Sequence, residues 1–366
     1  MKFPLGLLLL GLLGLSLLTG CSTPTRNPEV LAVMERVGDW QLANPGRWRA
    51  DEWHHGALYT GVMALAEISA SPRFRDAMVA VGEKQQWQLA PRPYHADDHC
   101  IGQMYAGLYL KDRDAKKIAP MRERFDWILA NRPVNTLVFD RQTNPKNQER
   151  WSWCDALFMS PPAWLRLWQA TGDRRYLDFA VSEWWFTSDY LYDQEEHLYF
   201  RDSTIFERRE KNGAKVFWSR GNGWVMGGLV RMLQLLPADH PSRPRFEQQF
   251  REMAAKVLTC QQADGLWRAS LLDPASYPMQ ETSGSGFYCY ALAWGVNAGL
   301  LPRATYVPVV RKTWAALTRF VQSDGKLTHV QPVGFTPVTF DENHTEPYGV
   351  GAFLLAGSEV YRLIPH

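Results

Sequence analysis

Residues 153–187 read WCDALFMSPPAWLRLWQATGDRRYLDFAVSEWWFT, a pattern typical of two helices joined by a tight turn. Apolar side chains recur at three- and four-residue steps in both halves, which is the spacing of one helix face. Thr171-Gly172-Asp173 lies between the halves, and glycine commonly ends a helix while aspartate caps the next one. The first half is rich in aromatic residues and poor in charge, whereas the second carries several charges. We therefore predict a hairpin of one buried and one outer helix.

The same hairpin recurs along the chain, and its copies predict a ring of helices. We expect buried helices at 53–68, 98–110, 153–170, 223–236, 285–299 and 349–363, and outer helices at 72–89, 115–131, 174–187, 242–261, 306–322 and 29–42. A helix that is apolar on all sides is buried, and one with a charged face lies outside. Alternation of the two kinds predicts an all-α fold, an (α/α)6 toroid. The first and last segments supply one half-hairpin each, which favours a closed ring over an open solenoid. Residues 191–217 are less helical and predict short strands or loops at the cavity mouth.

The first twenty residues have the pattern of a signal peptide. Lys2 precedes a run of leucine and glycine at 7–18, which is too short for a confident membrane span. Leu18-Thr19-Gly20-Cys21 resembles the bacterial lipoprotein motif, which would make Cys21 the lipidated N-terminus. The alternative is an ordinary secretory signal with a chance cysteine. We expect residues 1–20 to be removed, 21–28 to be a tether, and 29–366 to form one catalytic domain. That domain would be lipid-anchored in the bacterial periplasm or at the cell surface, with the outer membrane favoured.

The composition and charge of the chain indicate which class of ligand it binds. The formal net charge of the 366 residues is only +2, and no run of lysine or arginine stands out, which disfavours nucleic acid as a ligand. The 16 tryptophans fit carbohydrate binding, although a large helical core also holds many. The remaining cysteines show no metal-type spacing and are expected to be buried free thiols; they are Cys100, Cys154, Cys260 and Cys289. We expect a monomer without cofactor or metal.

Polar residues gather where the chain leads into each buried helix, and in a toroid these loops converge on one end of the central cavity. The segments concerned are Asp51–His55, Tyr94–His99, Trp151–Asp155, Trp218–Trp224, Glu281–Ser285 and Glu342–Tyr348. Asp155 has tryptophan, phenylalanine and methionine as neighbours in the sequence. A lone carboxyl group in apolar surroundings resists ionisation, so its pKa should be raised and it can donate a proton near neutral pH. The alternative is an acid satisfied within the core.

Other residues of these segments have two readings each. Asp97 and Asp98 suit a role in a site but also suit helix caps. Arg220 stands in a ring of aromatic residues and suits a substrate carboxylate, but it could instead bond loop carbonyl groups or an outer acid. Trp218 and Trp224 could be core. A metal site built from residues 95–99 is disfavoured, because these positions share no helix face and match no standard spacing.

Four strings in order resemble a known family. They are Ala96-Asp97-Asp98-x-x-x-Gly102-Gln103, Trp153-x-Asp155-x-x-Phe158-Met159-x-x-Pro162, Trp218-Ser219-Arg220-Gly221-Asn222-Gly223-Trp224, and the run from Tyr348 to Ala356. Together they resemble the unsaturated rhamnogalacturonyl hydrolases of glycoside hydrolase family 105, which are related to the unsaturated glucuronyl hydrolases of family 88. The resemblance covers nearly the whole chain after the signal peptide.

The resemblance implies removal of a terminal 4,5-unsaturated uronic acid from oligosaccharides that polysaccharide lyases produce, with rhamnogalacturonan fragments of pectin as the default. Asp155 would protonate C4 of the enol ether and then take a proton from the water that adds at C5. Asp97, or its neighbour Asp98, would be the second acid. The candidate substrate-binding residues are Trp53, His54, Asp98, His99, Trp151, Trp153, Arg201, Trp218, Arg220, Asn222, Trp224, His344 and Tyr348.

One departure leaves the substrate open. Arg201-Asp202 stands where many members of the family carry a histidine, so arabinogalactan-type glucuronides and ulvan fragments remain alternatives. Two other functions compete with the family's reaction. A sugar 2-epimerase of the same architecture would recruit His54, His95 and His344 for proton transfer. A lipid-anchored glycan-binding protein without catalysis would need only aromatic and polar loops.

Overall fold

The computed structural model describes Met1 and residues 27–363, which form an almost entirely helical domain. The inner helices are α2 (Trp53–Ala66), α5 (Gly102–Asp112), α8 (Pro161–Thr171), α10 (Ser219–Leu235), α12 (Thr282–Asn297) and α14 (Pro347–Arg362). The outer helices are α1 (Pro28–Ala43), α3 (Arg73–Lys84), α6 (Ala119–Ala130), α9 (Arg174–Leu191), α11 (Arg243–Cys260) and α13 (Arg303–Thr318). One-turn helices α4 (Ala96–His99) and α7 (Ala156–Met159) precede α5 and α8, and strands β1 (Tyr192–Asp193) and β2 (Leu198–Tyr199) form an antiparallel pair.

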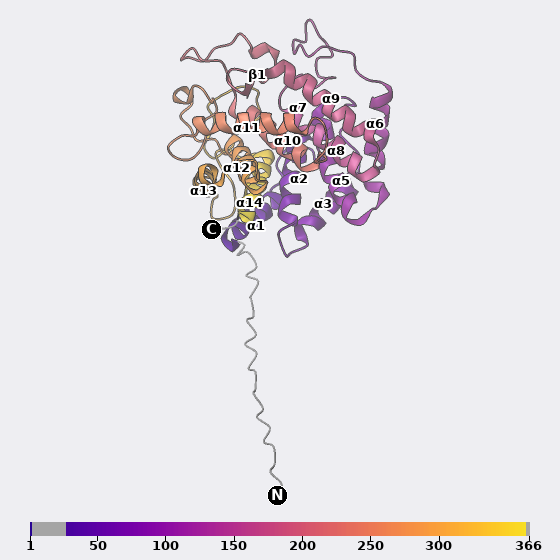
Figure 1. Ribbon diagram of the computed structural model, residues 1–366, viewed down its shortest axis with the longest axis horizontal. Coiled ribbons are helices and arrows are strands. Elements are labelled where there is room, and N and C mark those ends of the chain that lie inside the picture. Colours follow the sequence, from indigo (N-terminus) through magenta and orange to yellow (C-terminus); the bar gives the residue numbers. More distant parts are fainter. Residues whose placement is uncertain (2–26, 364–366) are drawn as a thin grey trace.

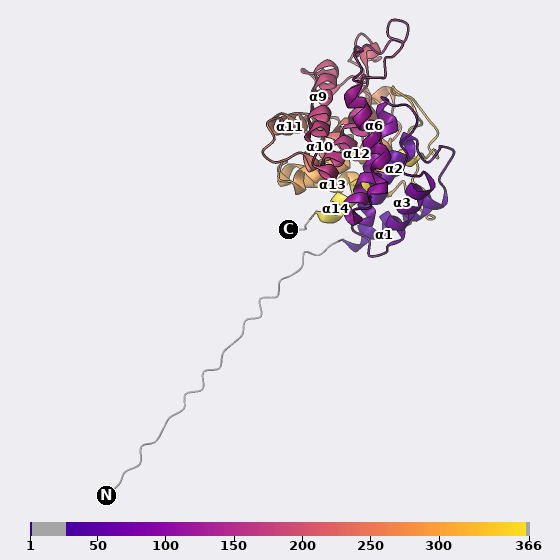
Figure 2. The same ribbon diagram turned by 90° about the vertical axis from the view of Figure 1, so that its right-hand side faces the viewer.

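The inner helices form a closed ring. Each contacts the next in the order α2, α5, α8, α10, α12, α14, and α14 returns to contact α2. The first helix, α1, packs on the last, α14, and both lie at the same side of the domain (Figure 1, Figure 2). The predicted (α/α)6 toroid is therefore confirmed, and the open solenoid is wrong. The short strands predicted within residues 191–217 are present as β1 and β2.

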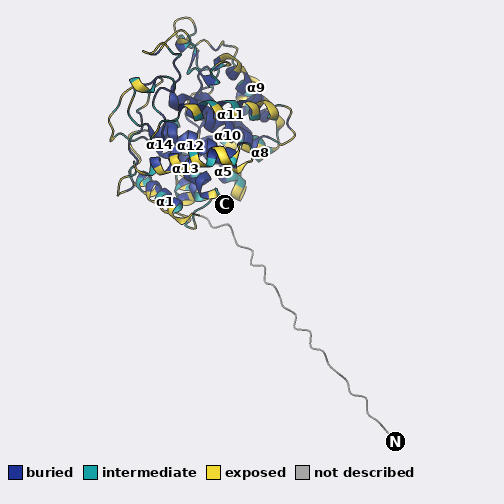
Figure 3. Ribbon diagram, turned by 60° about the vertical axis from the view of Figure 1, so that its left-hand side comes forward, coloured by how far each residue is buried: buried dark blue, intermediate teal, exposed yellow. Residues whose placement is uncertain are grey.

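Burial follows the predicted division between inner and outer helices. Nearly every residue of α10, α12 and α14 is buried, whereas α1 and α9 keep an exposed face (Figure 3). Glycines let the inner helices approach closely where the ring closes. A Cβ atom on Gly61 of α2 would lie 2.4 Å from the carbonyl oxygen of Gly351 in α14, so only glycine fits there.

Two predicted buried helices are broken, and both breaks lie beside the polar end of the ring. The helix expected at 98–110 is divided into α4 and α5 around Cys100 and Ile101. The helix expected at 153–170 is divided at Ser160, because two prolines follow and proline lacks the N–H group that would continue the helix. The short helices α4 and α7 contact each other.

Two further expectations concern the cysteines and the N-terminal segment. All four cysteines of the domain are buried free thiols, as expected. The predicted signal peptide and Cys21 lie outside the described residues. Across the part of the chain that the structure describes, every helix is too short or too polar to span a bilayer.

Candidate active site

A cavity of about 280 Å³ lies at the end of the ring where the inner helices begin. Its walls come from α4, α7, the start of α10 and two loops that are far apart in the sequence. The lining residues are Trp53, Asp97, Trp153, Asp155, Met159, Arg201, Trp218, Arg220, Val333, Gly334 and Phe335. The loops leading into the buried helices therefore converge as predicted, and they bring together two acids, two arginines and three tryptophans.

Asp155 sits immediately before α7 and is about nine-tenths buried. Burial raises the pKa of its carboxyl group, while the nearby charges of Arg201 and Arg220 act in the opposite direction. The Nε atom of Arg201 lies 3.6 Å from Asp155 Oδ2, and the thiol of Cys154 donates a long hydrogen bond of 3.5 Å to the same oxygen. The upward direction agrees with the expectation from sequence, although the surroundings of Asp155 include two cations as well as aromatic rings.

Asp97 is the second acid in the cavity. Burial raises its pKa to about 7, with Arg92 and Arg201 lowering it and the neighbouring carboxylates of Asp155 and Asp98 raising it. Because two nearby carboxylates disfavour each other's ionised form, the pair retains a proton at a higher pH than a lone acid would.

Asp98 faces away from the cavity lining. Its Oδ1 accepts a hydrogen bond of 2.5 Å from Arg92 Nη2, and its Oδ2 accepts one of 2.7 Å from the backbone N–H of Arg92. These bonds occupy both oxygens of a side chain that is almost fully buried. Of the two adjacent acids, Asp97 is therefore the one that can reach a ligand, and the prediction of substrate contact for Asp98 is not supported by its position.

Arg220 is buried and lacks an acidic partner among residues 27–363. It donates hydrogen bonds from Nη1 to the carbonyl oxygen of Gln331 (2.7 Å) and from Nη2 to that of Pro332 (2.8 Å). Its guanidinium group lies over the rings of Trp218 and Tyr348, at 4.5 and 4.9 Å from their centres. The alternative interpretation of Arg220, that it bonds loop carbonyl groups, is therefore correct for these contacts. Arg220 nevertheless lines the cavity, where no carboxylate of the described residues lies within ion-pair distance of it.

Arg201 is a second cation with a different set of contacts. Its Nη1 donates a hydrogen bond of 2.7 Å to Asp202, and its guanidinium group lies between the rings of Phe139 and Phe335, at 4.6 and 5.8 Å. Its charge is therefore partly balanced by Asp202 and Asp155, unlike that of Arg220.

The predicted aromatic residues divide into lining and core. Trp53, Trp153 and Trp218 line the cavity. Trp224 is fully buried against Phe287 and Phe158, at 4.4 and 5.0 Å between ring centres, so it belongs to the core. Two further predicted contacts, Trp151 and Tyr348, are also buried: Trp151 packs edge-on to Phe179, and the Tyr348 hydroxyl donates to the carbonyl oxygen of Gln331 at 2.7 Å.

Two polar residues of the predicted site serve the scaffold. The ring nitrogens of His99 lie 2.7 Å from Ser160 Oγ and 2.8 Å from the carbonyl oxygen of Pro93. The side chain of Asn222 accepts a hydrogen bond from the backbone N–H of Tyr199 and donates to the carbonyl oxygens of Tyr199 and Trp218. Both side chains are buried with their hydrogen-bonding groups occupied, which places them outside the lining predicted for them.

The histidines that an epimerase would need do not meet in the cavity. His54 is stacked between Trp48 and Trp53, with ring centres 3.7 and 3.8 Å away, and burial lowers its pKa to about 3. His95 packs against Trp153, and burial lowers its pKa to about 3 as well. His344 pairs with Glu346 at 3.2 Å, beside a different cavity. Neutral or distant histidines of this kind offer no paired acid and base.

Four lining residues were missed by sequence reasoning. Met159 follows the aspartate motif, and Val333, Gly334 and Phe335 lie in a loop without periodicity or charge. In the structure Val333 and Phe335 stand out as large apolar side chains that are exposed. This exposure cannot be recognised from the sequence alone. Among the described residues no cluster of histidine, cysteine, aspartate or glutamate is arranged to hold a metal ion.

Comparison with known proteins identifies the family. The model described as Glycosyl Hydrolase Family 88 matches residues 26–364. The chain belongs to glycosyl hydrolase family 88. The four sequence strings predicted family 105 and the related family 88, and the match confirms membership of this group. The solved structure of a family 88 glycosyl hydrolase from Bacteroides vulgatus is 30% identical, covers 92% of this chain and 99% of its own, and superposes with a TM-score of 0.83.

Two relatives carry a more specific name. An unsaturated 3S-rhamnoglycuronyl hydrolase from Alteromonas sp. is 36% identical over 364 residues, covering 93% of this chain and 88% of the relative. A protein of the same name from Formosa agariphila is 38% identical over 344 residues, covering 92% and 91%. This family 88 chain is therefore a glycoside hydrolase that is similar to these two enzymes along nearly its whole length.

Proposed function

We propose that this family 88 protein removes a terminal 4,5-unsaturated uronic acid from lyase-generated oligosaccharides by hydrating the enol ether of that sugar. The observation that carries the proposal is the pair Asp97 and Asp155 in one cavity, both with raised pKa, beside the unpaired charge of Arg220. An enol ether needs a protonated acid for C4 and a cation for the uronate carboxylate. The cavity supplies both.

Asp155 is the proton donor in this scheme. Its carboxylic acid protonates C4, the positive charge that develops at C5 is shared with the ring oxygen, and water adds at C5. The resulting carboxylate takes a proton from that water, so Asp155 ends the step protonated again. The hemiketal formed at C5 then opens and releases the rest of the oligosaccharide. This differs from attack at the anomeric carbon by two carboxylates.

Substrate binding favours the protonated form of Asp155. In the free enzyme burial raises the pKa of both Asp97 and Asp155, while Arg201 favours the ionised form of both and Arg220 favours that of Asp155. A uronate carboxylate bound to Arg220 neutralises that cation and removes one of the two influences that lower the pKa of Asp155. The pKa of Asp155 therefore rises further, which favours the acid form that protonates C4, while Asp97 lines the same cavity and can contact sugar hydroxyl groups.

Arg220 suits the carboxylate better than Arg201 does. The Nε atoms of both arginines are buried without a hydrogen-bond partner, but Arg201 is already paired with the carboxylates of Asp155 and Asp202, whereas among the described residues no carboxylate lies within ion-pair distance of Arg220. A guanidinium group that keeps an unused donor and is fixed by aromatic rings is prepared for bidentate contact. Of the three lining tryptophans, Trp53 is partly exposed and offers a flat apolar surface for a sugar ring, whereas Trp153 and Trp218 are almost fully buried in the cavity wall.

The names of the two relatives favour a rhamnose-linked uronide as the substrate. The test is a panel of unsaturated oligosaccharides from pectin, ulvan, arabinogalactan and glycosaminoglycan, followed by loss of the ultraviolet absorbance of the enol ether. We expect turnover of rhamnose-linked members and none of a saturated disaccharide with the same linkage. Hydrolysis of the saturated control would overturn the hydration mechanism, and failure on the whole panel would overturn the proposed function.

We also propose that Cys21 anchors the enzyme to a bacterial membrane through lipid, with the outer membrane as the favoured location. Growth of the producing strain with labelled palmitate tests this. The full chain should take up the label and the Cys21→Ser variant should not. An unlabelled wild-type protein would contradict the anchor.

A further inference from the structure

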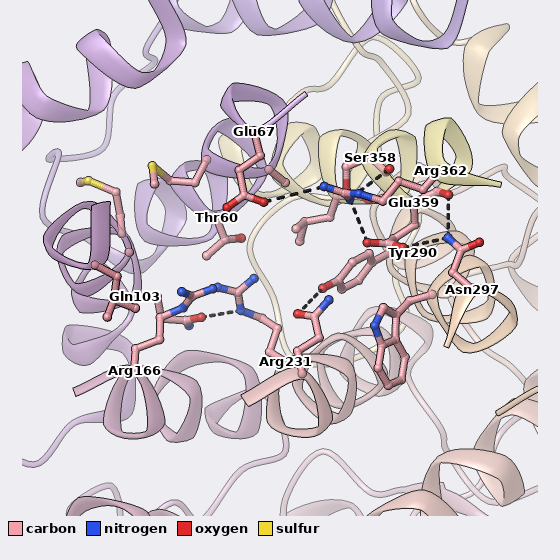
Figure 4. A pocket seen from close by; sticks show the side chains of 18 of the residues that line it. Thr60, Glu67, Gln103, Arg166, Arg231, Tyr290, Asn297, Ser358, Glu359 and Arg362 are labelled. Atoms are coloured by element: carbon pink, nitrogen blue, oxygen red, sulfur yellow. Dashed lines mark hydrogen bonds and ion pairs between the residues drawn. The ribbon is translucent and has the colours of Figure 1, made fainter. Parts of the chain in front are cut away.

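A second cavity lies at the opposite end of the ring from Asp155. Its volume is about 540 Å³, larger than that of the candidate active site, and all six inner helices contribute to its walls (Figure 4). Most of the lining residues lie in the C-terminal halves of these helices, although Gln103 and Met104 lie at the start of α5, whereas the helical residues of the active site, such as Trp53 and Arg220, lie at helix beginnings. The proposed reaction makes no use of this cavity.

The lining of this far cavity carries a formal charge of +2. It holds two acids and four cations, which are Glu67, Glu359, Lys111, Arg166, Arg231 and Arg362. The two acids are paired with the cations at the rim. Arg362 lies 3.0 Å from Glu359 and 3.7 Å from Glu67, and Lys111 lies 3.6 Å from Glu67. The positive charge that remains is that of Arg166 and Arg231.

Arg166 and Arg231 come from neighbouring helices, α8 and α10, and their guanidinium groups lie side by side in the cavity (Figure 4). Within the described part of the chain, no carboxylate lies within ion-pair distance of either, and Arg166 makes no hydrogen bond. Arg231 is only 5% exposed, and its Nε donates a hydrogen bond of 2.5 Å to Gln103 Oε1. Burial and the neighbouring charge of Arg231 lower the pKa of Arg166 to about 10, against the opposite influence of Glu67, so Arg166 remains cationic at neutral pH.

Arg231 is buried and Arg166 is partly buried, and two such adjacent cations without an ion-paired acid are costly to the fold, because each loses hydration and each repels the other. The partial negative charge at the C-terminal ends of the inner helices offsets part of this cost. Among the described residues, however, no backbone carbonyl group accepts a hydrogen bond from either guanidinium, and the partners of Arg231 are the side chains of Gln103 and Tyr290, so donors of both arginines remain for a ligand. A bound anion would satisfy both the charge and the donors.

We propose that the far cavity binds a small doubly charged oxyanion of the sulfate or phosphate class between Arg166 and Arg231. A guanidinium group donates two parallel N–H bonds to a pair of oxygens, and a tetrahedral dianion offers such a pair to each arginine. The formal charge of the lining matches that of a dianion. This site is separate from the proposed active site and does not depend on the proposed reaction.

Titration calorimetry of the full enzyme with sulfate and with phosphate, in a buffer whose only anion is large and singly charged, tests the proposal. We expect saturable binding of one anion per chain, weakened at least about tenfold in Arg166→Met. Arg174→Met is the matched control, because Arg174 is exposed on α9 and pairs only with Asp178. Absence of saturable binding of either anion, or equal binding by wild type and Arg166→Met, would overturn the site.

Thermal unfolding provides a second readout that a purely structural arginine would not give. Without the dianion, Arg166→Met should melt at or above the temperature of wild type, since it removes a partly buried charge that has no ion-pair partner among the described residues. With saturating sulfate the order should reverse, because only the wild type gains from ligand binding. If the variant is less stable by the same amount with and without sulfate, Arg166 only complements the helix ends and the proposal is wrong.

Discussion

Replacing Asp97 by asparagine should stabilise the protein at high pH and change little at low pH. The pKa of Asp97 rises from 3.8 to about 7 on folding. A raised pKa means that the folded state binds the proton more tightly than the unfolded state. The free energy of unfolding of the wild type therefore falls as pH rises through the window between these two values. Asparagine cannot ionise, so the variant escapes this loss.

The magnitude follows from the shift. Each pKa unit corresponds to 1.36 kcal/mol, so a rise of roughly three units is worth at most about 4 kcal/mol. Water in the cavity reaches the side chain, which is 16% exposed, and reduces the effect, so roughly 2–4 kcal/mol is expected. Urea unfolding followed by tryptophan fluorescence between about pH 4 and pH 8 measures the difference between variant and wild type.

The difference should grow steadily with pH. A constant difference, or a wild type that gains stability relative to Asp97→Asn as pH rises, would refute the reasoning. Asp98→Asn is the matched control, because its carboxylate accepts hydrogen bonds from the backbone N–H, Nε and Nη2 of Arg92. That variant should lose stability at pH 8, since a neutral amide cannot replace these charge-assisted hydrogen bonds.

Three further predictions concern catalysis and the core. The value of kcat/KM should fall about tenfold per pH unit on the alkaline side, once Asp97 and Asp155, whose pKa values burial raises, have lost their last proton; a profile that is flat to pH 9 contradicts this. Arg220→Met should lower kcat/KM by roughly 10- to 100-fold through the loss of a charged contact, and Arg220→Lys should lower kcat/KM by a smaller factor. Equal kcat/KM in the wild type and both variants would contradict the proposal that Arg220 binds the uronate carboxylate. Trp224→Ala should cost about 3–5 kcal/mol of stability by denaturant unfolding, whereas Trp53→Ala, at a partly exposed residue of the cavity, should mainly lower activity; the reverse result would contradict their assignment to core and cavity.

The toroid could be predicted because its signal lies within each helix. Buried helices such as 285–299 are apolar on every side, and outer ones such as 242–261 carry charge on one face, so alternation alone orders the ring. Where the prediction differed, at Ser160 and Cys100, a one-turn helix stands before the long one. Proline at 161 and 162 was visible in the sequence, but it is compatible with both the end of one helix and the start of another.

The site was less predictable than the fold, because the packing of the helices decides which side chains point into the cavity. Asp97 and Asp98 are adjacent and differ by about 100° around a helix, so only the position of α4 decides that Asp97 faces the cavity. The same holds for Trp218 and Trp224, of which only the first lines the cavity. Phe335 arrives from a loop that no helical pattern governs, and nothing in its sequence surroundings marks it.

The central claim is that the carboxyl group of Asp155 delivers the proton to C4. Its most direct test is Asp155→Asn, assayed for enol-ether loss on the best substrate of the panel, with binding measured in parallel. An asparagine cannot donate the proton, so turnover should fall by at least about 100-fold while substrate still binds. Turnover within a fewfold of wild type would contradict the account, because some other group would then supply the proton.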